Sequence, residues 1–381
     1  MIKIKITYVI TVIIAVLLLF IGNKIAVNDL FTLEYNSHNI VKAKVIRVLE
    51  YIKTSDITDG QTEFEGMPVV SNKIIFEAKI TNGDRKGEVV TAAQSMHSFI
   101  QGTQKEVSEN ASILLIFSNN EWYYSGHYRI NRLLILGILF VLCLLLFGGV
   151  KGFNTILSLA FTCSAIFAVF IPAILSGKNI YLMSMLVCVF TMIMTPLIVI
   201  GYNKKSLSSI LGCTGGVMIS GLIALIMDKL LFFTGVIDEH SRYLINLPGD
   251  IQLNLRAIVF AGIIIGAMGA VMDVAISISS SLWEVKEKAP SVKFKELFRS
   301  GITIGRDIMG TMADTLILAY IGSSLTVVLL LSVYSGSFLS LFNSEMIAVE
   351  ILQAMAGSFG ILFAMPLTAL FSSVIYLREK D

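Results

Sequence analysis

Residues 255–281 read LRAIVFAGIIIGAMGAVMDVAISISSS, an apolar run that contains one carboxylate, Asp273. Its small and polar side chains recur every three or four residues. They are Gly262, Gly266, Gly269, Asp273, Ser277 and Ser280. This spacing places all six on one face of a single helix. Because small residues let a neighbouring helix approach closely, the sequence predicts a buried helix contact, with the carboxylate pointing into it rather than into lipid.

A second stretch carries a related pattern. Residues 306–325 read RDIMGTMADTLILAYIGSSL, in which Asp307, Gly310 and Asp314 share one helix face. Thr311 and Thr315 lie beside them. We expect Asp314 at the membrane depth of Asp273, because each lies about two turns from the cytoplasmic end of its predicted span.

These two faces support two interpretations. In the first, the carboxylates and nearby hydroxyl oxygens bind Na⁺ or carry a proton, with Arg306 and Asp307 as charge partners. An ionised carboxylate at the bilayer centre costs about 2.5–3.5 kcal/mol on insertion scales, so compensation is needed. In the second, each aspartate hydrogen-bonds neighbouring hydroxyls and fixes helix packing. The ion or substrate site would comprise Asp273, Ser277, Ser280, Thr311, Asp314 and Thr315, and the helix contact Gly262, Gly266, Gly269 and Gly310.

The composition is that of an integral membrane protein. Of 381 residues, 55% are hydrophobic and 15% are charged, against about 25% charged in soluble domains. The mean hydropathy is +0.79. Several apolar runs reach the roughly 20 residues that span a bilayer. These values exclude a soluble enzyme. The net charge of +2 does not indicate nucleic-acid binding, because the basic residues cluster at helix ends.

We expect a mainly α-helical, polytopic protein with about eight transmembrane helices. Residues 1–21 form a signal anchor, since Lys3 and Lys5 precede an apolar run and no convincing cleavage site follows; cleavage is the alternative. Residues 131–381 form a seven-helix membrane domain. Its expected spans are 132–149, 154–176, 179–200, 207–231, 256–279, 308–332 and 355–377. In the span 207–231, Gly212 and Gly216 predict a close helix contact.

Residues 22–130 have a different character, with polar and apolar residues alternating in short runs. The strand-like runs are 41–45, 74–80, 88–91, 113–117 and 121–124. Five short strands in about 100 residues predict a small β-barrel or sandwich, with an OB-like barrel as one form.

The distribution of basic residues predicts the orientation. Thirteen Lys and Arg residues lie in the segments on the side of the N-terminus, against four in the short segments on the other side. Six of the thirteen belong to a loop expected after Ser281. The positive-inside rule therefore places both termini in the cytoplasm and residues 22–130 outside it. Residues 343–355 are either an interfacial helix or an outward extension of the last span.

No motif for enzymatic chemistry is present. Two membrane aspartates are typical of intramembrane aspartyl proteases, but Asp273 follows Ala-Val-Met and Asp314 follows Thr-Met-Ala, so the GxGD context is absent. There is no P-loop, HExxH or GxSxG motif. The four cysteines show no disulfide or metal-ligand spacing. The sequence therefore predicts no enzyme, no cofactor and no metal site.

Three runs carry a family resemblance. Residues 266–281 (GAMGAVMDVAISISSS), 305–312 (GRDIMGTM) and 315–320 (TLILAY) resemble the YibE/F-like family of bacterial membrane proteins. The resemblance covers residues 130–377, and the outer domain with its anchor is similar to the YibE-type member. It implies a bacterial cell membrane and a paralogous YibF-type partner chain. The family position of Asp314 is often Asn, which makes Asp273 the more important carboxylate.

Two functions are compatible with these features. The first is a permease, or a permease subunit, coupled to H⁺ or Na⁺ through Asp273. The second is a non-transporting scaffold or assembly factor, which docks the paralogous chain through its membrane helices and binds a partner through its outer β domain. The sequence does not identify a substrate.

Overall fold

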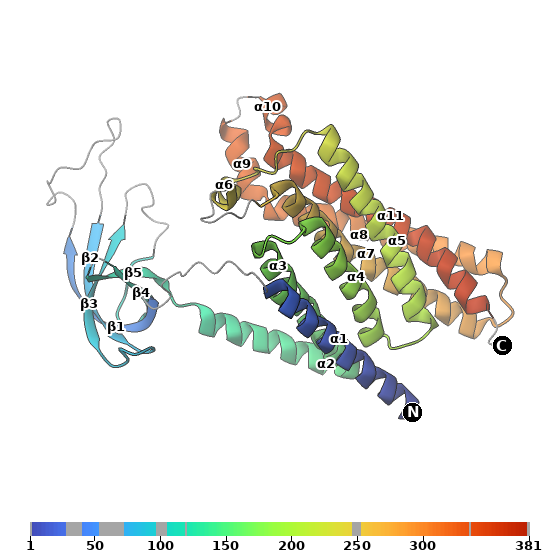
Figure 1. The fold of residues 1–381 in the computed structure, drawn as a ribbon, viewed down its shortest axis with the longest axis horizontal. Coiled ribbons are helices and arrows are strands. Elements are labelled where there is room, and N and C mark those ends of the chain that lie inside the picture. Colours follow the sequence, from blue (N-terminus) through green and yellow to red (C-terminus); the bar gives the residue numbers. More distant parts are fainter. Residues whose placement is uncertain are drawn as a thin grey trace. The chain divides into compact units, whose positions relative to one another are not determined.

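A computed structural model describes residues 2–27, 40–52, 72–96, 105–118, 120–245, 253–334 and 337–378. The chain divides into two compact units (Figure 1). One comprises Thr32–Cys143, and the other comprises Met1–Phe31 together with Leu144–Asp381.

The smaller unit contains a closed five-stranded barrel. Its strands are β1 Ile40–Ile52, β2 Asn72–Ile80, β3 Val89–Met96, β4 Ser112–Ser118 and β5 Glu121–His127. They are hydrogen-bonded in the order β1-β2-β3-β5-β4, with β1 also pairing β4 and with β3 parallel to β5. This is the strand order of OB-type barrels. The predicted barrel is confirmed over the sandwich.

Alternation of side chains builds the core of the barrel. Ala43 and Val45 of β1 and Ile74, Phe76 and Ala78 of β2 all point inward and are fully buried or nearly so. Lys44, between the two residues of β1, and Lys79, which follows Ala78, face outward, as the period of two requires. The five strand-like runs in the sequence correspond to these five strands.

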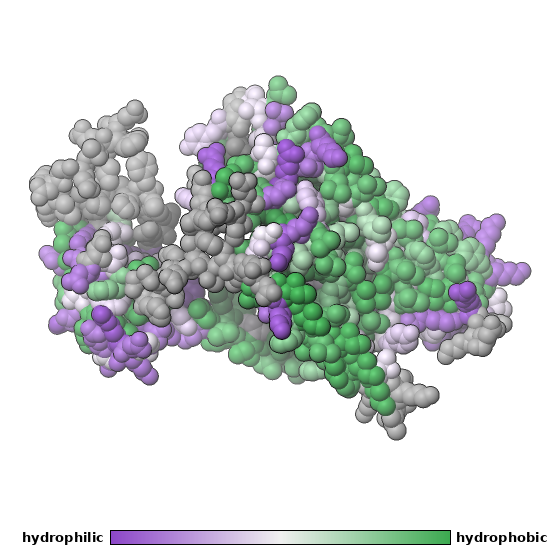
Figure 2. Space-filling model, in the orientation of Figure 1, coloured by the Kyte–Doolittle hydropathy of each residue, from purple (hydrophilic) through white to green (hydrophobic). Residues whose placement is uncertain are grey.

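The larger unit is helical. The helices of the chain are α1 Ile2–Val27, α2 Ile130–Ser164, a π-helix at Ala165–Phe170, α3 Ile171–Leu175, α4 Ile180–Val199, α5 Lys204–Leu230, α6 Glu239–Ile245, α7 Leu255–Lys288, α8 Phe294–Ser323, α9 Leu325–Tyr334, α10 Phe338–Asn343 and α11 Glu345–Leu377. Residues 130–143 of α2 belong to the smaller unit. Within the described residues, six helical segments are long and apolar enough to cross a membrane, or seven if the bent pair α8–α9 counts as one span. Figure 2 shows hydrophobic residues gathered over α1, α4 and α5.

The longest of these segments, Ile130–Leu175, contains a reversal. Its 46 residues would extend about 69 Å as one helix, twice the thickness of a bilayer core. Gly149 has non-helical angles, φ 52° and ψ −128°, in a region that glycine adopts readily. Any side chain at Gly152 would collide with the main-chain carbonyl of Leu144. Two helices therefore meet in a tight turn, as the expected spans 132–149 and 154–176 require, although the total of eight spans stays a prediction.

The structure corrects two expected boundaries and decides between the alternatives at a third. The segment expected as a loop after Ser281 is helical: α7 continues to Lys288, and α8 begins at Phe294. Its many Glu and Lys residues favour helix and solvate its surface. The span expected at 308–332 is instead divided between α8 and α9, which are bent by 60°. Finally, α11 begins at Glu345, so the outward extension of the last span is confirmed over a separate interfacial helix.

Helix α1 packs against the rest of the helical unit through polar contacts as well as apolar ones. Asn23 donates a hydrogen bond of 2.5 Å to the carbonyl of Ala168, inside the π-helix. A π-helix disturbs the regular helical ladder, so its carbonyls are available to outside donors. The hydroxyl of Ser176 bonds the carbonyl of Ala26 at 2.6 Å. These bonds connect α1 to the segment 165–176 near its C-terminal end.

The core of the helical unit is built around α11, which packs against α5, α7 and α8. At Gly216 of α5, a Cβ atom would lie 2.7 Å from the carbonyl oxygen of Gly360 and 2.8 Å from Val271. At Gly212, it would lie 2.8 Å from Cβ of Thr368. The predicted close contact at Gly212 and Gly216 is therefore confirmed, and its partner is α11.

Candidate functional site

The two helices that carry the membrane aspartates run antiparallel, joined by a short turn at residues 289–293. Their register follows from three contacts. Gly301 lies against Leu282, Gly305 lies against Ile278, and Gly266 lies against the hydroxyl of Tyr320.

This register places the two carboxylates at similar levels. Interpolating between the contacts puts Asp273 beside residues 310–313 of α8, and Asp314 beside residues 269–272 of α7. The offset between the two aspartates along the helix axes is about one turn or less. The expectation that they share a depth agrees with this geometry.

The small-residue face of α7 is not buried, in contrast to our expectation. Gly262, Gly266, Gly269, Asp273 and Ser277 are all exposed, and Ser280 is half-buried. The buried side of α7 is a different one, where aliphatic residues face α5 and α11 and, at Ile278, α8. It includes Ile264, Ala267, Val271, Ala275 and Ile278. The helix thus has two stripes, and within this chain the aliphatic stripe forms the core.

Helix α8 has the same arrangement. Its buried residues are Leu297, Gly301 and Gly305. The residues predicted for the site are all exposed: Arg306, Asp307, Gly310, Thr311, Asp314 and Thr315. We refer to these six residues of α8 and the five exposed residues of α7 as the open faces.

Polar contacts within the open faces are local. The hydroxyl of Thr311 bonds the carbonyl of Ile308 at 2.9 Å, and that of Thr315 bonds the carbonyl of Thr311 at 2.7 Å. Among the described residues, Asp273 and Asp314 have no hydrogen bond and no ion pair. The chain by itself therefore neither assembles the proposed set of oxygen ligands nor forms the bonds of the packing interpretation.

The glycines of the open faces differ in their surroundings. A Cβ atom at Gly262 would lie 3.4 Å from Nε2 of Gln353, and Gly266 lies under Tyr320. Gly269 and Gly310 have no neighbour within 4 Å among the described residues. A packing role for these last two would therefore require a second chain, and it stays a prediction.

A buried hydroxyl cluster at the cytoplasmic ends of α5, α7 and α11, in the predicted orientation, was not foreseen from the sequence. The hydroxyl of Tyr376 donates to the carbonyl of Ser279 at 2.9 Å and lies 2.9 Å from Oγ of Ser208. Oγ of Ser209 lies 2.5 Å from Oγ of Ser279. Deeper in the same core, the buried hydroxyls of Ser220 and Thr368 have no partner among the described residues. Serines at helical spacing in 206–209 were the available signal.

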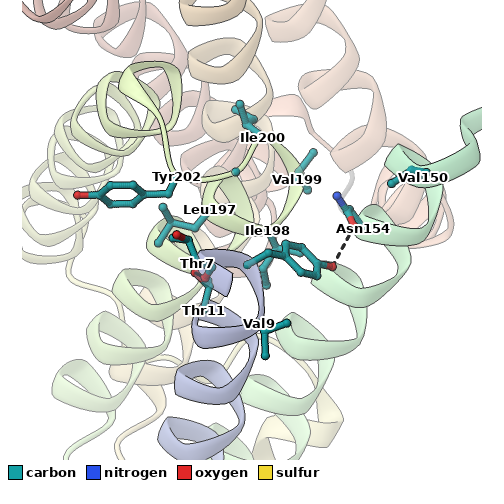
Figure 3. A pocket seen from close by; sticks show the side chains of 12 residues that line it. Thr7, Val9, Thr11, Val150, Asn154, Leu197, Ile198, Val199, Ile200 and Tyr202 are labelled. Carbon is teal, nitrogen blue, oxygen red and sulfur yellow. Dashed lines mark hydrogen bonds between the residues drawn. The ribbon is translucent and has the colours of Figure 1, made fainter. Parts of the chain in front are cut away.

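A cavity of about 560 Å³ opens between α1, α2 and the end of α4 (Figure 3). Its lining is mostly apolar, including Ile198 and Val199, and at one edge the hydroxyl of Tyr8 donates to Asn154 at 2.9 Å. None of the predicted site residues lines it. Such a cavity suits an acyl chain or an apolar side chain rather than an ion.

Comparisons with known proteins give one match. Residues 136–378 match a family model described as YibE/F-like protein. No curated protein and no solved structure matches the chain. Within the described residues, no group of three or more His, Cys, Asp or Glu side chains could hold a metal ion.

Proposed function

The chain belongs to the YibE/F-like family, and we propose that it is a subunit of a membrane permease, coupled to H⁺ or Na⁺ through Asp273. The observation that carries this proposal is the position of Asp273, exposed and without a polar partner among the described residues, on a helix of a membrane protein. A carboxylate facing lipid is strongly disfavoured, and such residues in membrane helices face a cavity or another protein surface.

A second membrane chain would complete the site. Gly269 and Gly310 lie near the levels of the two aspartates and leave open space on both helices, so another helix can approach the carboxylates closely. The oxygen atoms that this chain does not supply would then come from the partner or from water. The proposed partner is a paralogous YibF-type chain, on the strength of the family resemblance.

In this proposal the protein lies in the bacterial cell membrane with both termini in the cytoplasm. The support is the excess of basic residues in the short segments on that side, several of them at the tip of the α7–α8 hairpin, among them Lys286, Lys288, Lys293 and Lys295. The barrel is then extracytoplasmic. Division of Ile130–Leu175 at Gly149, with α8–α9 as one span, would give eight spans and an even number, as this orientation requires.

The direct test follows the coupling ion, because the substrate is unidentified. The chain is reconstituted in liposomes with its co-purifying partner, and H⁺ or Na⁺ uptake is driven by an imposed potassium diffusion potential. Asp273→Asn should lower the ion flux at least about tenfold, while membrane insertion and complex formation persist. Asp228→Asn, the same change at the end of α5, is the control and should retain the flux. Full flux in Asp273→Asn would contradict the proposal.

The second function, a scaffold without transport, has one feature in its favour. The barrel has its own closed core and, together with the beginning of α2, forms a unit distinct from the other helices, which suits an independent binding module. This alternative expects that deletion of residues 30–125 abolishes function in cells while Asp273→Asn is tolerated. The permease proposal expects Asp273→Asn to abolish function in the same cells, so this comparison separates the two.

A further inference from the structure

A cavity of about 550 Å³ lies where the barrel meets the beginning of α2. Three cations line it: Lys105 from the segment before β4, and Arg129 and Arg132 from the junction of β5 with the first turn of α2. One carboxylate, that of Glu109, also lines the cavity. The lining charge is therefore net positive.

Further features add to the positive potential. The ammonium of Lys42 lies 3.9 Å from the centre of the Tyr128 ring, and Tyr128 is part of the cavity wall. The cavity also includes Asn131, in the first turn of the long helix α2. Backbone N–H groups at a helix N-terminus carry partial positive charge and favour anions.

The wall that carries Lys105 is held in place by the barrel. Gln94 of β3 is buried, and its side-chain amide bonds both the carbonyl of Lys105 at 3.2 Å and the N–H of Val107 at 2.9 Å. Elsewhere in the lining, the N–H of Tyr128 bonds the carbonyl of Ser112 at 2.9 Å. Both parts of the lining are therefore fixed before a ligand enters, which limits the entropy lost on binding.

The location of the cavity limits the ligands that can reach it. Helix α2 continues from Arg132 as an apolar run, and its side chains from Leu133 to Leu142 are exposed. Arg132 therefore lies at the point where the chain enters the membrane, at the level of lipid headgroups. Basic residues at this level attract anionic lipids.

We propose that this cavity binds a phosphate group, and that Arg129 and Arg132 are its principal ligands. Arginine suits this role because its planar guanidinium can donate two parallel hydrogen bonds to phosphate oxygens. The phosphate is that of an anionic lipid headgroup or of free phosphate in the surrounding solution. The proposal does not depend on the permease function.

The test uses the full chain in mild detergent and measures the thermal unfolding of the barrel alone. The chain contains two tryptophans, so Trp283→Phe leaves Trp122, in the barrel core, as the only reporter. Thermal unfolding is followed by its fluorescence while dihexanoyl phosphatidylglycerol, dihexanoyl phosphatidylcholine or sodium phosphate is added at matched ionic strength. We expect a saturable increase in the melting temperature with phosphatidylglycerol and none with phosphatidylcholine. An equal increase with sodium phosphate would identify free phosphate as the source.

Variants assign the binding to this cavity. Arg129→Gln combined with Arg132→Gln should raise the apparent dissociation constant at least about tenfold, because two charge-assisted hydrogen bonds are lost. Lys79→Gln combined with Lys86→Gln removes the same charge from exposed barrel positions outside the cavity and should have little effect. If the double arginine variant does not fold, Glu109→Gln tests the proposal instead. Removing the only carboxylate among the described lining residues should lower the apparent dissociation constant severalfold. Unchanged affinity in the arginine or glutamate variant, or no melting-temperature change in the parent chain, would overturn the proposal.

Discussion

Two regions of the helical unit have the same kind of sequence and opposite environments. On α5 and α11, the small and polar residues Gly212, Gly216, Ser220, Gly360 and Thr368 are packed against one another or against Val271 in the core. On α7 and α8, Gly269, Asp273, Gly310, Thr311 and Asp314 are exposed. Small residues at helical spacing therefore predict that a helix can approach closely, but they do not tell whether that helix belongs to the same chain.

The two regions also differ in the cost of leaving their polar groups unpaired. Two buried hydroxyls of the packed region lack partners among the described residues, yet a neutral hydroxyl is far less costly in an apolar environment than an ionised carboxylate. The open faces carry three aspartates. We infer that the packed region stabilises the chain, whereas the open faces serve association and ion chemistry. The predictions below test this division, from the largest expected effect on stability to the smallest.

The largest effect is expected for Gly216→Leu, since even a Cβ atom at this position would lie 2.7 Å from a main-chain oxygen. Overpacking of this kind costs about 1–3 kcal/mol or more. Thermal unfolding of the purified chain in detergent should show a clearly lowered melting temperature. Gly269→Leu, the matched change on an open face, should leave it nearly unchanged. Equal destabilisation by both variants would contradict the distinction between the packed region and the open faces.

A moderate effect is expected for Tyr376→Phe in the buried hydroxyl cluster. This change removes the hydrogen bond to the carbonyl of Ser279 and should cost about 0.5–1.5 kcal/mol. Ser277→Ala, on the open face of α7, is the comparison and should change the free energy of unfolding by less than about 0.5 kcal/mol. Denaturant titration of both variants in the same detergent measures the difference. A larger cost for Ser277→Ala would reverse the assignment of the two regions.

The smallest effect on stability is expected for Asp273→Asn and Asp314→Asn in the purified chain. Neither carboxylate has a polar partner among the described residues, so no interaction within the chain is lost. The melting temperature should stay within about 1–2 °C of the unmodified chain, consistent with a surface substitution. A decrease as large as that of Tyr376→Phe would show that the aspartates have structural partners inside the chain.

The fold was largely predictable because its elements depend on local patterns. The five strands follow from alternation, as in Ala43 and Val45, and the helices from long apolar runs. Where charged residues such as Glu284 and Lys286 continued a helix into water, hydropathy alone suggested a loop. No sequence signal identified the bend between α8 and α9.

The positions of the candidate site residues along their helices were predictable, but the side of α7 that is buried was not. Spacing correctly placed Asp273 among small residues on one face and Asp314 at a similar level. It could not assign the buried side of α7, because Ile264, Val271 and Ile278 define an equally regular stripe. Hydrophobic burial of that stripe against α5 and α11 decided the rotation of the helix. The cationic cavity was missed because Lys105 and Arg129 meet only after the barrel closes.

The most direct test of the central claim, that the open faces meet a second chain, is photo-crosslinking in native membranes. The photoreactive residue p-benzoylphenylalanine is placed at Ser277 on the open face of α7, or at Met218, which is exposed on the apolar side of α5. We predict one discrete protein adduct from position 277, identified by mass spectrometry as the paralogous membrane chain, and no protein adduct from position 218. No protein adduct from position 277, or equal adducts from both positions, would contradict the account.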